Sequence, residues 1–217
     1  MKPYLAGATP ILPVLVLTLF FAAASAMAAE DEGGCAPRYR ALVEAARVEL
    51  RGTGDTEVLI VTDPLCWHCR LGHKLVGEYP DLYGRVKVLF LPGRSFLGSD
   101  MAAWVIEDVA GTDRLKPLLD FAYRDLRQPK VSDLDEARML ILAQFTAAFP
   151  DMLEGTTLPD LFLRLAKEHG PRVAAGAELA RAAQLPGTPI LIAGDTIVMG
   201  YGPEAWLEAL AAKSVCP

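Results

Sequence analysis

The sequence predicts an α/β fold in which a β-α-β unit is followed by a block of helices and then by a β-β-α unit. Two short β-branched runs, Glu57–Thr62 and Val86–Leu91, enclose a stretch long enough for a helix. Nearly every segment of residues 99–184 has helical spacing, and two further strand patterns flank Gly194-Asp195. With 217 residues, 52% of them apolar, the chain can form one domain with a substantial core.

The charge of the chain limits its partners. The formal net charge is −6 and the pI is about 5.1, and Lys and Arg form no cluster. Nucleic acids and anionic membrane surfaces attract basic patches. Neither is therefore an expected partner.

The N-terminus resembles a secretory signal peptide, assigned to residues 1–28. An apolar run, Ile11–Phe21, is followed by the small residues Ala22–Ala29. The alternative is a retained membrane anchor, since Tyr4–Ala29 carries no charge. Either assignment places the folded part in an oxidising compartment, where disulfide bonds persist.

The first elements follow in order. In residues 29–56, apolar side chains at helical spacing predict a helix over Ala36–Leu50, which Gly52 ends. Cys66–Tyr79 is the predicted helix of the β-α-β unit, whose two strands should therefore be parallel.

The helical block should supply much of the core. Helices are predicted over Met101–Val109, after Ser132, over Leu158–His169 and over Val173–Gln184. Ser132 begins a near-match to a capping box. The large side chains expected in the core are Trp104, Phe121, Phe145 and Phe162.

The last elements are a hairpin and a helix. Ile190–Ala193 and Thr196–Tyr201 flank a two-residue turn signal. The final helix should begin at Pro203, where a missing N–H is tolerated, and end near Lys213.

The stretch richest in potentially reactive side chains is DPLCWHCRLGH, from Asp63 to His73. At a helix N-terminus, free N–H groups and the helix dipole favour Cys66 as a thiolate, while Cys69 lies one turn inward. His68 would add positive charge, and Trp67 offers an apolar face for docking unfolded chains. This pattern predicts thiol-disulfide exchange.

The cysteines allow two other interpretations. Cys66, Cys69 and His73, with His68 or His169 as a further ligand, would suit zinc or copper in a metal-binding or chaperone module. The chain has no second C-x-x-C motif to complete such a site. A purely structural Cys66–Cys69 bond would be strained and hence reactive.

The order of motifs resembles a known family. A C-x-x-C on the helix of a β-α-β unit, a helical insertion, and Gly187-Thr188-Pro189 ahead of a hairpin and helix resemble the thioredoxin fold of the periplasmic disulfide oxidoreductases, the DsbA/DsbC/DsbG group. The resemblance covers residues 57–217, with the insertion at about 99–184. It implies that Cys66 is the nucleophile, that Cys69 resolves the mixed disulfide, that Pro189 is cis, and that no cofactor is used.

The resemblance also bears on the direction of exchange. The insertion is similar to DsbA, whereas Asp63-Pro64 and Thr188 are similar to DsbC and DsbG, so a protein that reduces or isomerises disulfides is favoured over a DsbA-like oxidase. The acidic residue found six positions before the first cysteine in thioredoxin and DsbA is replaced by Ile60. Residues 29–56 leave no room for a dimerisation domain, so a monomer is expected.

The resemblance implies partners and a location. Substrates would be unfolded or misoxidised secreted proteins in the periplasm, with a membrane or soluble redox partner. Cys35 and Cys216 are assigned to a structural disulfide, and two free thiols or a redox relay are the alternatives. His169 is placed in the C-terminal turn of a helix, without a function.

Overall fold

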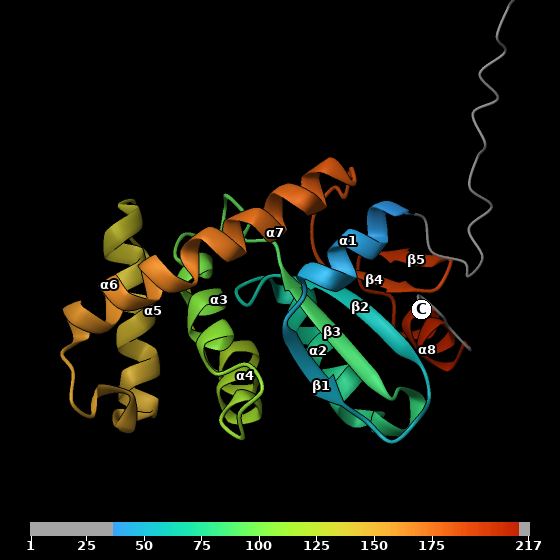
Figure 1. The fold of residues 1–217 in the computed structure, drawn as a ribbon, viewed down its shortest axis with the longest axis horizontal. Helices are drawn as coiled ribbons and strands as arrows, with labels where there is room; N and C mark the ends of the chain where they lie inside the picture. Colours follow the sequence, from blue (N-terminus) through green and yellow to red (C-terminus); the bar gives the residue numbers. More distant parts are fainter. Residues whose placement is uncertain (1–36, 213–217) are drawn as a thin grey trace, which may run out of the picture. The chain divides into compact units, whose positions relative to one another are not determined.

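The computed structural model describes residues 37–212, which form a mixed five-stranded sheet with helices on both faces (Figure 1). The strand order is β1-β3-β2-β4-β5. Strands β2 and β3 are parallel, and every other neighbouring pair is antiparallel. The strands are β1 (Val48–Arg51), β2 (Glu57–Thr62), β3 (Arg85–Phe90), β4 (Ile190–Ala193) and β5 (Thr196–Met199).

The predicted N-terminal helix is too long. Helix α1 spans Pro37–Ala45, and Val48–Arg51 forms the edge strand β1, antiparallel to β3. The apolar residues Val48 and Leu50 lie two positions apart, and they pair with Val88 and Val86. A period of two fits a strand, and the pairing with β3 outweighs the local helical spacing.

Strand β2 is central and is buried on both faces, which explains why its sequence is a continuous apolar run rather than an alternating one. Leu59 and Val61 pack with α1 and with α7 (Gly170–Ala182) on one face. Val58 and Ile60 belong to the larger core on the other face, which holds α2 (Trp67–Glu78) and α8 (Pro203–Ala211). The sheet therefore lies between two helical layers.

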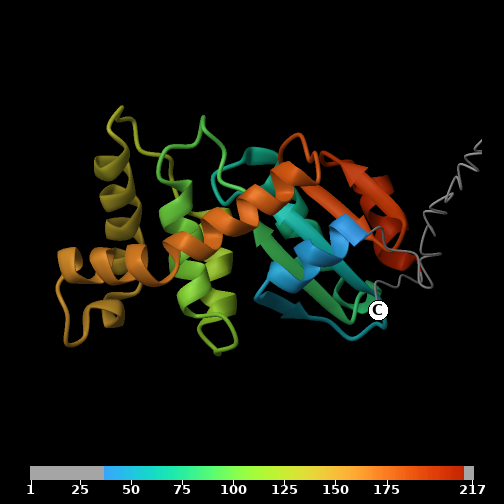
Figure 2. The same cartoon turned by 45° about the horizontal axis from the view of Figure 1, so that its top comes forward.

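The insertion is helical, as predicted, and Figure 2 shows its helices gathered beside the sheet, with α7 leading back across it. Besides α7 it contains α3 (Ser99–Asp108), α4 (Leu115–Arg124), α5 (Leu134–Ala148) and α6 (Leu158–Glu168). Trp104 and Phe145 are buried in the core as expected, while Phe121 and Phe162 are partly buried against it.

The start of α5 differs from the expectation. Its N-cap is Asp133 rather than Ser132, and the Asp133 side chain accepts a hydrogen bond from the Glu136 amide at 2.8 Å. Aspartate is as good an N-cap as serine, and a carboxylate also interacts favourably with the helix dipole. Leu134, the first residue of α5, is exposed.

The chain ends with the predicted hairpin and helix. Gly194, with φ 57°, lies in the turn between β4 and β5, where a positive φ matches the twist of the strands. Helix α8 begins at Pro203 and packs Trp206 into the core. The predicted signal segment, Cys35 and Cys216 lie outside the described residues. Among residues 37–212, no helix is long and apolar enough to cross a membrane.

Candidate active site

The loop after β2 places the first cysteine at the start of a helix. Cys66 is the N-cap of α2, with extended backbone angles, so the free amides of the first turn point toward its side chain. Asp63, fully buried, holds this loop. Its carboxylate accepts hydrogen bonds from the Leu65 amide at 2.8 Å and from the Gly93 amide at 2.7 Å, which ties the ends of β2 and β3 together.

The second part of the site comes from the loop before β4. The Sγ atom of Cys66 lies 3.7 Å from the Thr188 carbonyl oxygen, and the Thr188–Pro189 peptide bond is cis. The Thr188 side chain also lowers the pKa of both cysteine thiols. The two segments that the sequence singled out therefore meet at one end of the sheet.

The electrostatics of the site favour the Cys66 thiolate. The pKa of Cys66 is lowered to about 5, and a hydrogen bond from the Cys69 thiol is the largest cause, against the opposing effect of burial. The backbone amides of Cys69 and His68 and the Thr188 side chain also contribute to this lowered pKa. His68 thus contributes through its backbone N–H, as the helix N-terminus predicts.

Cys69 has the opposite character. Its side chain is buried, and the pKa of its thiol is raised strongly, first by burial and then by its hydrogen bond to Cys66. The Asp63 amide donates to Cys69 Sγ at 3.4 Å. Both thiols are unbonded in the structure, which therefore represents the dithiol form. A reactive outer thiolate beside a protonated inner thiol is the arrangement that disulfide exchange requires.

The two residues between the cysteines face solvent. Trp67 is 65% exposed, and His68 is exposed as well. An exposed indole beside the nucleophile is available to an apolar segment of another protein. The sequence predicted this position for Trp67.

His73 does not join the cysteines as a ligand. Its Nε2 atom lies 2.9 Å from Asp120 Oδ1, and its ring stacks on Tyr123 with centroids 4.6 Å apart. Among residues 37–212, the one group of three side chains close enough to hold a metal ion is Asp108, Glu168 and His169, far along the chain from the C-x-x-C. The metal-binding alternative therefore has no support from the positions of Cys66, Cys69 and His73.

His169 is the C-cap of α6, which is the helix C-terminal turn where it was expected. Its Nε2 atom lies 2.9 Å from Asp108, and both oxygens of that carboxylate are also bonded to Arg164, at 2.6 and 2.9 Å. A carboxylate held by a guanidinium fork is already neutralised. The cluster links α3 to α6 and needs no ion.

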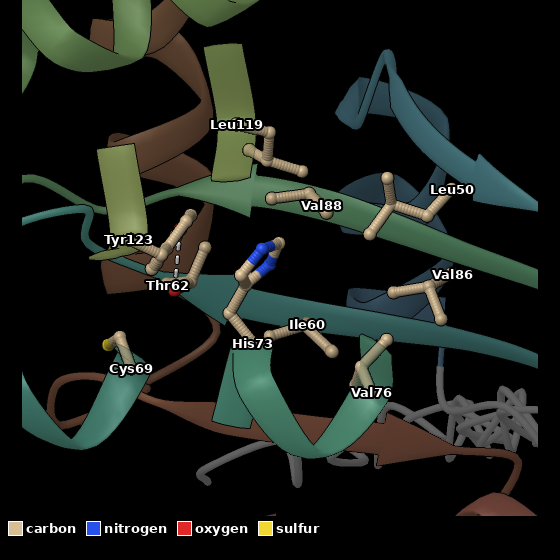
Figure 3. Close-up of a pocket in the computed structure, with 10 residues that line it drawn as sticks. All are labelled: Leu50, Ile60, Thr62, Cys69, His73, Val76, Val86, Val88, Leu119 and Tyr123. Atoms are coloured by element: carbon tan, nitrogen blue, oxygen red, sulfur yellow. Dashed lines mark hydrogen bonds between the residues drawn. The ribbon is translucent and has the colours of Figure 1, made fainter. Parts of the chain in front are cut away.

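Sequence reasoning missed three polar residues near the pair. Thr62, the last residue of β2, shares a 2.9 Å hydrogen bond with the Tyr123 hydroxyl, and both side chains line a small cavity with Cys69 and His73 (Figure 3). The third is Asp120, the partner of His73. A tyrosine among the buried apolar residues of α4 was the available signal, although its partner could not be read from the sequence.

Comparisons with known proteins agree with this architecture. No family model matches the chain, and no curated protein matches it. The thiol-disulfide exchange protein α-DsbA2 from Wolbachia pipientis has a similar solved structure, with TM-score 0.52, 16% identity, and 80% of this chain and 90% of that one covered. A periplasmic thioredoxin-like protein from Salmonella enterica serovar Typhimurium has TM-score 0.51, 20% identity, and 82% and 95% covered. BdbD from Bacillus subtilis has TM-score 0.53, 16% identity, and 77% and 94% covered.

These likenesses concern the fold, and they cover both the sheet and the helical insertion. The C-x-x-C pair at the start of α2 and Pro189 ahead of β4 occupy the positions that the resemblance assigned to them. The chain therefore has the thioredoxin-like fold of the DsbA-like thiol-disulfide oxidoreductases.

Proposed function

We propose that this protein catalyses thiol-disulfide exchange on secreted proteins through Cys66 and Cys69. The observation that carries the proposal is the Cys66 thiolate, held at a helix N-terminus with a pKa of about 5 and directly beside the loop of Thr188. At neutral pH such a thiol is ionised, and the thiolate is the attacking species in disulfide chemistry.

The exchange proceeds in two steps. The Cys66 thiolate attacks one sulfur of a substrate disulfide, forms a mixed disulfide and releases the other substrate sulfur as a thiolate. Cys69 then attacks Cys66, so that the Cys66–Cys69 bond forms and the second substrate thiol leaves. Two electrons pass from the cysteine pair to the substrate. Running backward, the same steps oxidise a substrate dithiol.

The stabilised Cys66 thiolate supports the oxidising direction. It stabilises the dithiol form of the pair, and each unit by which a thiol pKa falls below the working pH corresponds to about 30 mV toward a more oxidising potential. A dithiol oxidase is therefore our first candidate. Reductase or isomerase activity, which Thr188 and Asp63-Pro64 favoured at the level of sequence, is the second, because Thr188 contacts the cysteine pair directly.

The exposed Trp67 supports unfolded or misoxidised proteins as substrates, because such chains expose apolar segments. The signal-like N-terminus supports the periplasm as the location, either as a soluble protein or on a retained anchor. There the protein would act as a monomer and exchange electrons with a membrane or soluble redox partner.

Activity on ribonuclease tests both the reaction and its direction. Wild-type protein should oxidise reduced ribonuclease faster than it restores activity to scrambled ribonuclease, and Cys66→Ser should abolish both activities. Efficient recovery of the scrambled substrate would establish the second candidate. Equal rates with wild type and Cys66→Ser would reject thiol-disulfide exchange altogether.

A further inference from the structure

Resolution of the mixed disulfide requires Cys69 to lose its proton, and its surroundings oppose that loss. The Cys69 side chain is buried, and burial raises the pKa of its thiol. A buried thiol needs a proton acceptor within reach of its sulfur atom, directly or through hydroxyl groups and water. The question is which side chain of this protein plays that part.

A cavity of about 20 Å³ lies beside Cys69, large enough for one water molecule. Six of its lining side chains are aliphatic, including Ile60 of β2, and none of these can accept a proton. Its polar lining consists of Cys69, Thr62, Tyr123 and His73 (Figure 3). The candidates are therefore few, and His73 is the one base among them.

Two hydroxyl groups link Cys69 to the rest of the cavity. The Thr62 side chain lines the small cavity beside Cys69 and lowers the pKa of the Cys69 thiol, and its Oγ1 atom lies 2.9 Å from the Tyr123 hydroxyl. A hydroxyl can accept one proton while it donates another. Thr62 and Tyr123 can therefore pass a proton away from the sulfur without becoming charged.

His73 is held with an acceptor nitrogen available. Asp120 is bonded to His73 Nε2 at 2.9 Å, and hydrogen bonds from Lys116 and His73 keep the pKa of Asp120 below its usual range despite burial. Because an ionised carboxylate can only accept a hydrogen bond, His73 must carry its single ring proton on Nε2 to bond Asp120. The other ring nitrogen, Nδ1, is then unprotonated and can accept a proton. Burial lowers the pKa of His73, so the ring is neutral at physiological pH.

Other charged groups also face His73. Lys116 and Arg124 of α4 lower its pKa, while Asp120 raises it. A second cavity, of about 300 Å³, is lined by His73 but not by Cys69. The further charged residues that line this second cavity are Glu49, Arg51 and Asp113.

We propose that His73, oriented by Asp120, accepts the proton of Cys69 through Thr62, Tyr123 and one water molecule in the small cavity. The inference rests on the proposed function and concerns its second step. As Cys69 attacks Cys66, its S–H proton moves to Thr62, the Thr62 proton moves to Tyr123, and the Tyr123 proton moves through water to His73. The Cys66–Cys69 bond forms, the bond from Cys66 to the substrate breaks, and the substrate sulfur leaves as a thiolate.

Asp63 is the rival acceptor, because it is buried and its pKa is raised to about 6 by burial. Its carboxylate oxygens, however, accept from the Leu65 and Gly93 amides, and only its backbone amide contacts Cys69. The geometry therefore gives Asp63 the role of holding the loop in place and His73 the role of proton acceptor for Cys69.

The test follows the two steps separately. Reduced full-length protein is mixed with an aromatic disulfide that releases one coloured thiolate when Cys66 attacks and a second when Cys69 resolves. In His73→Phe, which keeps an aromatic ring against Tyr123, the first phase should be unchanged and the second slower by about 10-fold or more. Tyr123→Phe and Asp120→Asn should also slow only the second phase, and Glu78→Gln, an exposed change on the same helix, should slow neither.

The pH profile separates proton transfer from a merely structural effect. In wild type the second phase should level off once His73 is neutral, whereas in His73→Phe it should rise about tenfold per pH unit with hydroxide. A second phase with the wild-type rate and profile in His73→Phe would overturn the relay. So would a profile that changes in Asp63→Asn but not in His73→Phe or Asp120→Asn. Absence of the first phase in wild type would instead reject the exchange reaction itself.

Discussion

The sulfur atom of Cys66 lies 3.7 Å from the backbone carbonyl oxygen of Thr188, although 122 residues separate the two positions in the chain. Between them lie α2, β3 and the whole helical insertion. The contact exists because β2, which leads to Cys66, pairs with β4, which follows Thr188. The redox chemistry proposed for Cys66 therefore involves a residue from a distant part of the chain.

Thr188→Val should raise the pKa of Cys66 from about 5 by about 1 unit, because it removes a hydrogen bond to a charged sulfur. The pH dependence of alkylation by iodoacetamide, read by peptide mapping, measures this pKa. In wild type, Cys66 should be labelled before Cys69, with half-maximal rate near pH 5. Thr196→Val, at an exposed position of β5, is the matched control and should leave the profile unchanged. Labelling of Cys69 first would contradict the assignment of the nucleophile.

Asp63 should make the folded protein less stable as the pH rises. Its pKa is raised from 3.8 to about 6 by burial, so between these values the folded state binds more protons than the unfolded state. The contribution of Asp63 to the free energy of unfolding is fully present below pH 3.8 and is lost as the pH rises through about 6. The total loss is about 3 kcal/mol.

Urea unfolding of reduced wild type and Asp63→Asn at a series of pH values isolates this contribution, because other groups titrate in both proteins. The free energy of unfolding of wild type relative to the variant should fall between pH 4 and 7. A constant difference across that range would show that Asp63 has an ordinary pKa.

Gly72→Ala should destabilise the protein by about 1–3 kcal/mol. An added Cβ at Gly72 would lie 2.5 Å from the ring of Trp206, which is fully buried and donates a hydrogen bond to the Gly200 carbonyl at 2.9 Å. The indole therefore cannot move aside without losing that bond.

Gly77→Ala on the same helix is the matched control. No atom lies within 4 Å of a Cβ at this position, so the change should stabilise α2 by up to about 1 kcal/mol through helix propensity. Thermal unfolding measures both effects. Equal shifts in Tm for the two variants would mean that α2 and α8 are not packed as described.

The disulfide between Cys35 and Cys216 remains a prediction, because both residues lie outside the described range. Closing a loop of this length would be worth up to about 5 kcal/mol through the entropy of the unfolded chain. The double variant Cys35→Ala, Cys216→Ala should lose stability and keep its exchange activity. Peptide mapping of the native protein that finds both thiols free would exclude the bond.

The sequence by itself determined the elements whose signals are local. The apolar run of β2, the cysteine pair at the start of α2 and the glycine turn of the last hairpin each depend on residues a few positions apart. Helix and strand periods, turn chemistry and the positive end of a helix act over that same range. For the same reason the sequence alone predicts that Cys66 is the thiolate.

Only the tertiary structure decided which distant residues meet. The end of the helix predicted over Ala36–Leu50 instead belongs to strand β1, because β3 supplies backbone hydrogen bonds and apolar partners that a local pattern does not contain. The hydrogen bonds of Thr62 with Tyr123 and of His73 with Asp120 join β2 and α2 to the insertion in the same way. Contacts of this kind depend on how the insertion packs against the sheet. Spacing along the chain does not encode that packing, because it arises from the combined burial of many side chains.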